Sequence, residues 1–392
     1  MERELQTDRQ SILLLGATGS VGRAVARLLL TETSHNLVLA SRHAADCRKL
    51  AAELLAVPTS LPTTASPASR LAVREVDATD SKSLTEALDG VGTMIVAAPL
   101  ASRIPAIARV ALNRKVNWLD VLYPPRVAKL LAPFNAAVAA AGLTWVTQAG
   151  VHPGLPAALV RFVAQRGPAL ASVDLRLLMN LNDLGSVDSI AEVLREWVST
   201  RVRAWENGAW KNVTVPRARA IDFGRFGRRA CVPMELPELE ALPSELKLDH
   251  MAAWASGFNG VTDYVVMPVG LLLTRLAPRM GARLAARCLS WAAQMFASPP
   301  FGVVLQADCT TREGEVVRLR VEHADAYAFA AASTVGCLSQ MLDGTVSHVG
   351  IRPMGACVDP AELIADLRRL GCAVEQKRTA QAAPARANPA VQ

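Results

Sequence analysis

The chain is poor in charged and in aromatic side chains. Charged residues make up 20% of its 392 residues and aromatic residues 5%, whereas hydrophobic residues reach 51%. A disordered protein has the opposite balance, with abundant charge and little apolar surface to bury. The composition therefore excludes a disordered chain and predicts a large core, enough for about two or three domains of ~150 residues each.

Paired cysteines and common catalytic signatures are also missing. The seven cysteines are scattered and form no CxxC or CxxH cluster, which excludes a disulfide framework and a structural zinc site. The histidines share no metal-ligand spacing, so we predict no metal. Neither a GxSxG motif, nor a P-loop, nor a paired-carboxylate signature is present.

No long uncharged apolar run is available to span a membrane. The most apolar stretch, 265–300, contains four arginines and has no uncharged window of about 18 residues. The first ten residues lack the basic-then-apolar order of a signal peptide, so we expect a cytoplasmic protein. The arginines recur at every fourth position and predict one cationic helix face, which lies in solvent or meets an anionic lipid surface. These residues are Arg275, Arg279, Arg283 and Arg287.

The formal net charge of +7 is unevenly distributed. Segment 195–229 has nine basic and three acidic residues, whereas 235–249 has five acidic residues and one lysine. A nucleic-acid platform would add aromatic residues within a longer basic run, so we expect no nucleic-acid partner. The local positive charge instead favours a small-molecule substrate that is anionic.

Short apolar runs alternate with helical patterns through the first 150 residues. Such alternation is typical of an α/β protein with a doubly wound parallel sheet, the Rossmann architecture. The expected strands are 11–15, 36–40, 71–76, 93–97, 117–121 and 143–147, and the expected helices are 20–30, 42–56, 81–88, 103–113 and 125–141. Residues 58–69 are expected to form a surface loop.

Longer strands and hairpins follow. Residues 171–181 alternate apolar and polar side chains, as a half-buried strand does. Asn207-Gly208 tolerates the positive φ angles of a tight hairpin turn, which would place Trp205 opposite Trp210. A second hairpin is expected around Glu313-Gly314.

These patterns predict a second, mixed α/β domain. We expect a Rossmann domain at 10–150, completed by a returning helix at about 348–375. The second domain, 151–347, would serve substrate binding or dimerisation, with a homodimer as the expected assembly. Residues 376–392, rich in Ala, Pro and Gln, are expected to form a disordered tail.

A glycine-rich segment links the first expected strand to the first helix. Gly16, Gly19 and Gly22 stand where backbone approaches a pyrophosphate that the helix N-terminus also attracts. The second strand ends at Ser41-Arg42, without the acidic residue that would bind the ribose of NAD. Arg42 suits a 2′-phosphate or is a solvated helix start; the first alternative makes NADP the cofactor, with NAD less favoured.

Further cofactor contacts are expected after the third and fourth strands. Asp77 would meet the adenine, and Ala97, Ala98 and Pro99 would line the cofactor, unless these residues serve ordinary loop structure. The full set of predicted cofactor contacts is Gly16, Ala17, Thr18, Gly19, Ser20, Val21, Gly22, Ser41, Arg42, Asp77, Ala97, Ala98 and Pro99.

Several segments together resemble the saccharopine dehydrogenase-like oxidoreductases. They are the glycine loop, Asn117-Trp-Leu-Asp120, the loop 150–156, the segment 223–229, Ala324-Asp-Ala-Tyr-Ala-Phe329 with Leu342-Asp-Gly344, and the closing Asp359-Pro360 helix. The resemblance implies an NADP- or NAD-binding Rossmann domain, a second α/β domain, and hydride transfer at an imine or secondary amine. The family's fifth strand often continues as Asp-x-x-Gly-Glu, whereas this chain has Asp120-Val-Leu-Tyr-Pro-Pro125. The missing carboxylate argues against an amino-acid substrate.

The loop His152-Pro153-Gly154 would face the ligand crevice of the sheet. His152 titrates near neutrality and would exchange a proton, or it caps the next helix. Asp120 would orient His152, hold the substrate, or bond loop amides. Pro153, Gly154 and Arg228 are predicted substrate contacts, with surface charge as the alternative for Arg228.

The predicted function is NADP-dependent hydride transfer to or from an imine, a secondary amine or a carbonyl. The alternative is a peripheral, lipid-associated protein that binds a nucleotide without catalysis, since a fold alone does not settle function.

Overall fold

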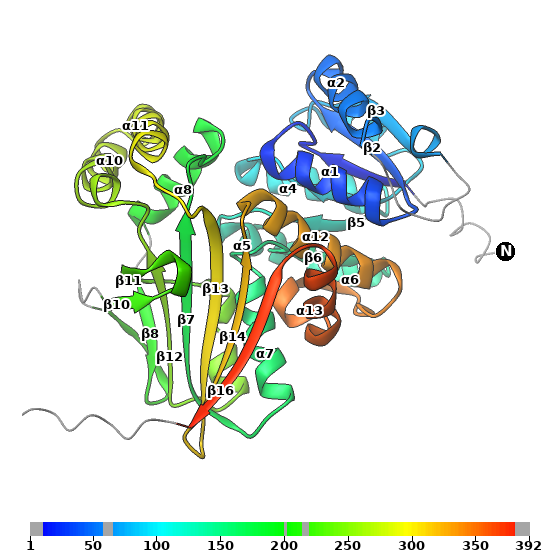
Figure 1. Ribbon diagram of the computed structural model, residues 1–392. Coiled ribbons are helices and arrows are strands. Elements are labelled where there is room, and N and C mark those ends of the chain that lie inside the picture. Colours follow the sequence, from blue (N-terminus) through cyan, green and yellow to red (C-terminus); the bar gives the residue numbers. More distant parts are fainter. Residues whose placement is uncertain (1–10, 58–65, 200–201, 214–218, 381–392) are drawn as a thin grey trace, which may run out of the picture.

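A computed structural model describes residues 11–57, 66–199, 202–213 and 219–380. Its first sheet has seven strands in the order β15-β6-β5-β4-β1-β2-β3, and every neighbouring pair is parallel. The expected doubly wound Rossmann sheet is therefore confirmed (Figure 1). The strands are β1 (Ser11–Leu15), β2 (Asn36–Ser41), β3 (Leu71–Glu75), β4 (Val91–Val96), β5 (Asn117–Asp120), β6 (Thr144–Thr147) and β15 (Gly350–Pro353).

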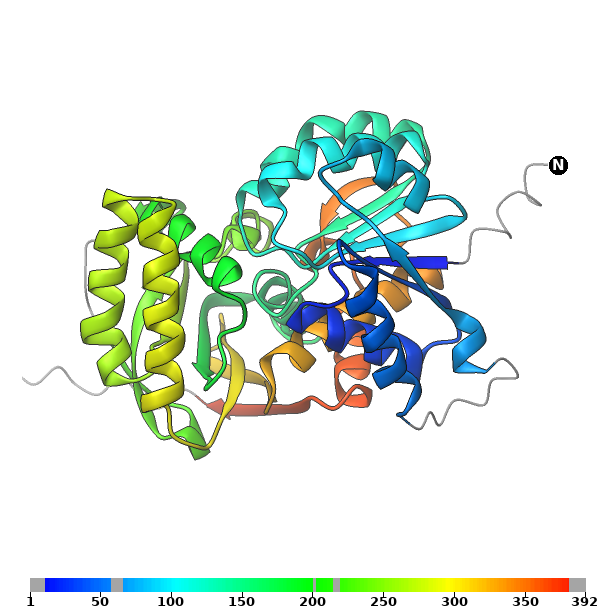
Figure 2. The same cartoon turned by 90° about the horizontal axis from the view of Figure 1, so that it is seen from above.

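Helices cover both faces of this sheet, which is why its strands read as continuous apolar runs (Figure 2). One face packs on α1 (Ser20–Glu32) and α2 (Ala44–Leu55), and the other on α3 (Ser81–Ala87) and α4 (Ile104–Asn113). The helix expected over 125–141 is broken into α5 (Arg126–Leu131) and α6 (Asn135–Ala140). Pro133, in the 3₁₀ turn between them, has no amide to continue an α-helix.

The second sheet has nine strands and mixed directions. Its main path is β10-β11-β12-β7-β13-β14-β16; off this path β8 pairs with β12, and β9 pairs with β8. Within that path β12 and β7 run parallel and the other pairs are antiparallel. The strands are β7 (Leu170–Asn180), β8 (Arg203–Glu206), β9 (Ala209–Asn212), β10 (Arg219–Asp222), β11 (Arg228–Met234), β12 (His250–Ser256), β13 (Gly302–Thr311), β14 (Glu315–His323) and β16 (Ala373–Ala380).

Both expected hairpins are confirmed. Trp205 faces Trp210 across β8 and β9, and their ring centroids lie 5.7 Å apart. The turn residues Asn207 and Gly208 have φ angles of 51° and 85°, as the turn requires. Gly314, in the turn between β13 and β14, also has a positive φ of 85°.

The C-terminal region differs from the expected helix and tail. Residues 350–353 form a strand of the first sheet, and α13 (Pro360–Arg369) follows it, with Asp359 accepting the amides of Ala361 and Glu362. The predicted tail is wrong for 376–380, which belong to β16 and pair with β14. The reason is that β14 offers a free edge, which backbone hydrogen bonds complete whatever the side chains are. Residues 381–392 of the predicted tail, and 58–65 of the predicted loop, lie outside the described residues.

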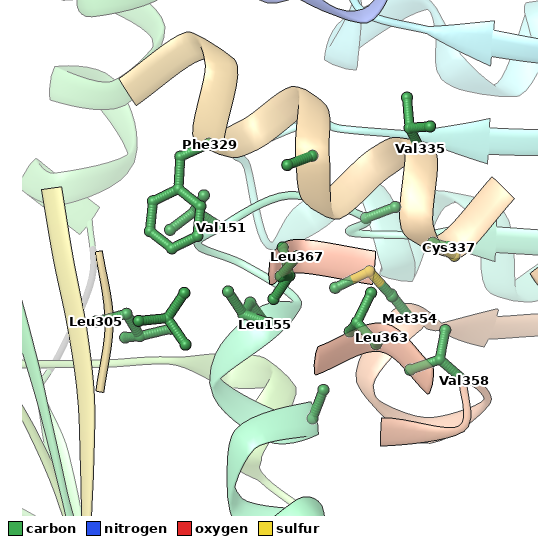
Figure 3. Packing of buried hydrophobic residues seen from close by; sticks show 14 of the residues in the cluster. Val151, Leu155, Leu305, Phe329, Val335, Cys337, Met354, Val358, Leu363 and Leu367 are labelled. Atoms are coloured by element: carbon green, nitrogen blue, oxygen red, sulfur yellow. The ribbon is translucent and has the colours of Figure 1, made fainter. Parts of the chain in front are cut away.

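One hydrophobic core joins the two sheets. The helix α12 (Ala326–Leu342) packs on α1 on one side and on α13 on the other. In Figure 3, Phe329 of α12 lies close to Val151, above Leu155 of α7 (Leu155–Gln165) and Leu305 of β13. The remaining helices are α8 (Val187–Ser199), α9 (Leu242–Glu245), α10 (Met267–Leu276) and α11 (Met280–Phe296).

Candidate functional site

The glycine loop allows three pieces of backbone to approach closely. Gly16 has a φ of +86°, and a Cβ there would lie 2.8 Å from the Cβ of Ala98. A Cβ on Gly22 would lie 2.1 Å from the carbonyl oxygen of Gly16. Only glycine fits either position, so the loop holds the start of α1 against the ends of β1 and β4.

The N-terminus of α1 is open to an anion. Gly19 precedes the helix and no side chain caps it. The amide of Arg23 makes the first backbone bond, to the Gly19 carbonyl at 2.8 Å. The earlier amides of the first turn therefore point out of the helix, which is the arrangement that binds a pyrophosphate.

The other predicted loop contacts lie around this turn. Ala17 is buried and its amide donates to the Ala40 carbonyl at 3.3 Å, while the Thr18 carbonyl accepts from Arg23 Nε at 3.1 Å. These bonds fix the loop between β1 and α1. Ala97, Ala98 and Pro99 follow β4 directly, and the backbone of the first two contacts the Gly16 position.

A second group gathers after β2 and β3. The Ser41 hydroxyl donates to the His43 carbonyl at 3.0 Å and accepts the His43 amide at 3.3 Å, so it already organises the start of α2. Arg42 is exposed. Asp77 accepts the amide and the hydroxyl of Thr79, which lowers the pKa of its carboxyl, and the positive charges of Arg42 and Arg103 act on it too. Arg103, which the sequence did not single out, is thus a second cation in this region.

Tyr123, His152 and Glu238 form a cluster at the carboxyl ends of β5 and β6. We call it the buried cluster because it holds buried polar atoms of His152 and Glu238. The His152 ring meets the Tyr123 ring edge-on, with centroids 5.2 Å apart and an interplanar angle of 80°. Burial lowers the pKa of His152 to about 4, and its Nδ1 is buried with no hydrogen-bond partner among the described residues. The expectation that His152 titrates near neutrality is therefore wrong, because a desolvated imidazole stays neutral.

Glu238 is the titratable group of this cluster, and the sequence did not single it out. Its Oε1 accepts the amide of Gly154 at 3.0 Å, while Oε2 is buried and has no partner in the described part of the chain. Burial raises the pKa of this carboxyl to about 7. The sequence shows Glu238 only as one of five acidic residues within 235–249, so nothing but the fold distinguishes it.

Tyr123 connects this cluster to α8. Its hydroxyl accepts the indole N–H of Trp197 at 2.6 Å. Burial raises the pKa of Tyr123 to about 12, and the negative charge of Glu238 acts in the same direction. The phenol therefore stays protonated and neutral beside the imidazole of His152.

The contacts of Asp120 are those of a structural residue. Its side chain is fully buried; Oδ2 accepts the Trp118 indole N–H at 2.8 Å, and Oδ1 accepts the amides of Leu122 and Gln148, both at 3.2 Å. Burial raises the pKa of this carboxyl. Of the roles considered for Asp120, this geometry favours bonding of loop amides: the side chain holds the ends of β5 and β6 that carry Tyr123 and His152.

The predicted substrate contacts do not all lie together in the structure. Gly154, with a φ of +122°, and Pro153 lie in the buried cluster, where a Cβ on Gly154 would meet the Gln148 carbonyl at 1.9 Å. Arg228 is exposed at the start of β11, opposite Asp222, and no described contact brings it to the cluster. Three neighbouring cations are held in ion pairs within the fold. These pairs are Arg203 with Glu235, Arg219 with Asp174, and Arg225 with Glu322.

Tyr327, near the start of α12, is a further missed residue. Its hydroxyl donates to the Asp183 carbonyl at 3.5 Å, and the side chain of Ser20 lies near enough to influence its pKa. Burial raises the pKa of Tyr327 to about 12. This phenol therefore joins the glycine loop to a loop of the second sheet.

Comparison with known families decides what the first sheet binds. Residues 12–146 match the family model described as the saccharopine dehydrogenase NADP binding domain. This segment is a saccharopine dehydrogenase-type NADP-binding domain. The predicted resemblance and the predicted NADP cofactor are both confirmed at this level, and the domain places the chain among the NAD(P)-dependent oxidoreductases.

One solved structure shares the overall fold of this chain. The apo saccharopine dehydrogenase (L-Glu forming) of Saccharomyces cerevisiae matches 95% of this chain and 100% of its own, at 14% identity and a TM-score of 0.66. An engineered D-amino acid dehydrogenase bound to NADP+ matches 91% of this chain and 96% of its own, at 13% identity and a TM-score of 0.46. A comparison with curated proteins finds no significant match.

Proposed function

We propose that the protein transfers hydride between NADP(H) and the carbon of an imine or secondary amine, with Glu238 handling the proton. The observation that carries this proposal is the buried Glu238 carboxyl, which has one free oxygen and a pKa of about 7. It contacts the loop after β6, and β6 ends at the same edge of the parallel sheet as β1. That edge is where doubly wound sheets bind their ligands.

The cofactor half of the proposal rests on the glycine loop. The uncapped amides of α1 would hold the pyrophosphate, and Arg42 with Arg103 would face the 2′-phosphate. Ala97 and Ala98 pack closely on Gly16, and their small side chains would line the dinucleotide. NADPH, when bound, supplies the hydride; the protein orients it and excludes water.

The proton half follows from the buried cluster. When hydride adds to the imine carbon, the nitrogen takes a proton, and the protonated Glu238 is its donor; the reverse reaction uses the carboxylate as the base. A group with a pKa of about 7 serves both directions near neutral pH. The neutral His152 and Tyr123 would shape the substrate position.

We choose an imine or a secondary amine over a carbonyl because the chain resembles the saccharopine dehydrogenase-like family. The carboxylate missing at Pro124-Pro125 argues against a simple amino-acid substrate. Incubation with NADPH and separate panels of keto acid plus amine, keto acid alone and lipid carbonyls, followed by nicotinamide absorbance, tests it. We expect oxidation of NADPH only when an imine can form. Turnover with carbonyls alone would overturn the imine assignment. NADPH binding without any turnover would instead favour the non-catalytic alternative.

A further inference from the structure

The pair of helices α10 and α11 presents an unusual apolar surface. The two helices lie side by side at the edge of the molecule, on α8, as both ribbon views show (Figures 1 and 2). Their inner faces are closed by small residues, with Gly270, Ala282 and Ala285 all buried. Their outer faces have no cover in the described structure.

Exposed large hydrophobic side chains are concentrated on this pair and on the π-helical turn (Thr262–Val266) that leads into α10. Eleven of the fifteen such residues described in the chain fall within 261–296. On each helix they recur every three or four residues, which places them on one face. We call them the apolar face; it consists of Val261, Tyr264, Val265, Val269, Leu272, Leu276, Met280, Leu284, Trp291, Met295 and Phe296. A concentration of exposed apolar side chains of this kind marks an interaction surface.

Positive charge accompanies the apolar face. The sequence contains no Asp or Glu between Asp263 and Asp308, whereas four exposed arginines lie within that interval. Within the described ranges one of these arginines forms an ion pair: Arg283 meets Asp188 of α8 at 2.8 Å. The surface therefore combines apolar side chains with unneutralised cations. These cations are Arg275, Arg279 and Arg287.

We propose that α10 and α11 dock the protein on the surface of an anionic membrane. The apolar face would enter the boundary between headgroups and acyl chains, and the arginines would bind lipid phosphates. No helix in the described ranges is long and apolar enough to cross a membrane. The prediction that the four arginines form one helix face is wrong, because the chain turns between α10 and α11. Arg275 lies on α10, Arg279 precedes α11, and the other two lie on α11.

A second copy of the chain fits this surface less well. In a symmetric dimer the same patch meets itself, so arginines would face arginines with no carboxylate between them. Like charges placed across an interface weaken it. An anionic bilayer supplies both the missing negative charge and an apolar layer. The proposal does not depend on the substrate or on hydride transfer.

Co-sedimentation with phosphatidylcholine vesicles, with or without phosphatidylglycerol, tests this docking. We expect the full chain to pellet with the anionic vesicles, less with the neutral ones, and less as salt rises. The double variant Leu276→Glu/Met280→Glu, at positions 73% and 81% exposed, should reduce binding by about tenfold or more. Val349→Glu, 55% exposed outside the patch, is the matched control and should bind like the unaltered chain.

A charge series separates the arginines from the apolar residues. Arg275→Gln/Arg279→Gln should weaken binding to anionic vesicles only, whereas Arg48→Gln/Lys49→Gln, on the exposed side of α2, should leave it unchanged. Circular dichroism and the unfolding temperature confirm that each variant is folded. Failure to pellet with anionic vesicles, or equal pelleting of folded Leu276→Glu/Met280→Glu, overturns the proposal. The proposal is also overturned if the unaltered chain binds no vesicles and forms a dimer in sedimentation velocity, whereas Leu276→Glu/Met280→Glu is a monomer. That result would assign the apolar face to contact with a second copy.

Discussion

The Oε1 oxygen of Glu238 accepts the amide of Gly154 at 3.0 Å, across 84 residues of sequence. This bond places a carboxyl with a pKa of about 7 next to the loop that follows β6. The Glu238→Gln variant keeps an acceptor for the Gly154 amide but loses the titrating proton. We expect kcat to fall by 10²- to 10⁴-fold, the usual contribution of a general acid or base, with little change in the Kd for NADPH. Unchanged kcat would remove Glu238 from the chemistry.

The same carboxyl makes stability depend on pH. Because burial raises its pKa from 4.5 to about 7, the folded state holds the proton more tightly than the unfolded state. The contribution of this carboxyl to the free energy of unfolding is full below pH 4.5 and is lost as the pH rises through 7. The loss amounts to at most about 3 kcal/mol. Denaturant unfolding of the unaltered chain and of Glu238→Gln at pH 5 and pH 8 measures it. The variant should gain relative stability at pH 8, and parallel pH curves would contradict the raised pKa.

Arg42 should decide between NADP and NAD. Removing a charge-assisted bond to the 2′-phosphate costs about 1.5–3 kcal/mol, so Arg42→Ala should weaken NADPH binding about tenfold or more. NADH, which lacks that phosphate, should bind the variant and the unaltered chain alike. Arg48→Ala, an exposed arginine of α2, is the control. Equal NADPH affinity of Arg42→Ala and the unaltered chain would reject the role of Arg42.

Gly22→Ala should damage the cofactor loop. Its Cβ would lie 2.1 Å from the Gly16 carbonyl oxygen, so the loop or α1 has to move. We expect a lower unfolding temperature and a loss of NADPH affinity. In Gly167→Ala the new Cβ lies 3.6 Å from its nearest neighbour, an ordinary contact, and both quantities should stay near those of the unaltered chain. Indistinguishable Gly22→Ala and Gly167→Ala proteins would show that the loop is not tightly packed.

Tyr123 and Trp197 should be energetically coupled. Tyr123→Phe removes the acceptor that lies 2.6 Å from the Trp197 indole nitrogen, at a cost of about 1 kcal/mol of unfolding free energy. Trp197→Phe in the Tyr123→Phe background should then cost less than it does alone. A double-mutant cycle in denaturant unfolding measures the coupling. Additive effects would mean that the hydrogen bond contributes nothing to stability.

Much of the fold could be predicted because local rules and tertiary structure agree. The parallel strands β1 and β4 are buried on both faces, and their apolar runs show it. Asn207-Gly208 encodes its turn, and Asp359-Pro360 encodes the start of α13. The glycine loop was recognisable for the same reason, since Gly16 and Gly22 are required by backbone geometry.

The missed features depend on contacts between distant segments. β16 is a polar sequence that becomes a strand because β14 leaves an edge open. Glu238 differs from its acidic neighbours only because Gly154 and the buried cluster surround it. His152 looked like a neutral-pH titrating group, and its burial by the rest of the fold changed that. Tyr327 meets Ser20 only once α12 has packed on α1.

Calorimetric titration of the intact chain with NADPH and, separately, with NADH tests the NADP-dependent role most directly. We predict one saturable NADPH site per chain. The affinity for NADH should be lower by about tenfold or more, because only NADPH offers Arg42 a 2′-phosphate. The absence of NADPH binding would contradict the proposed function at its first step.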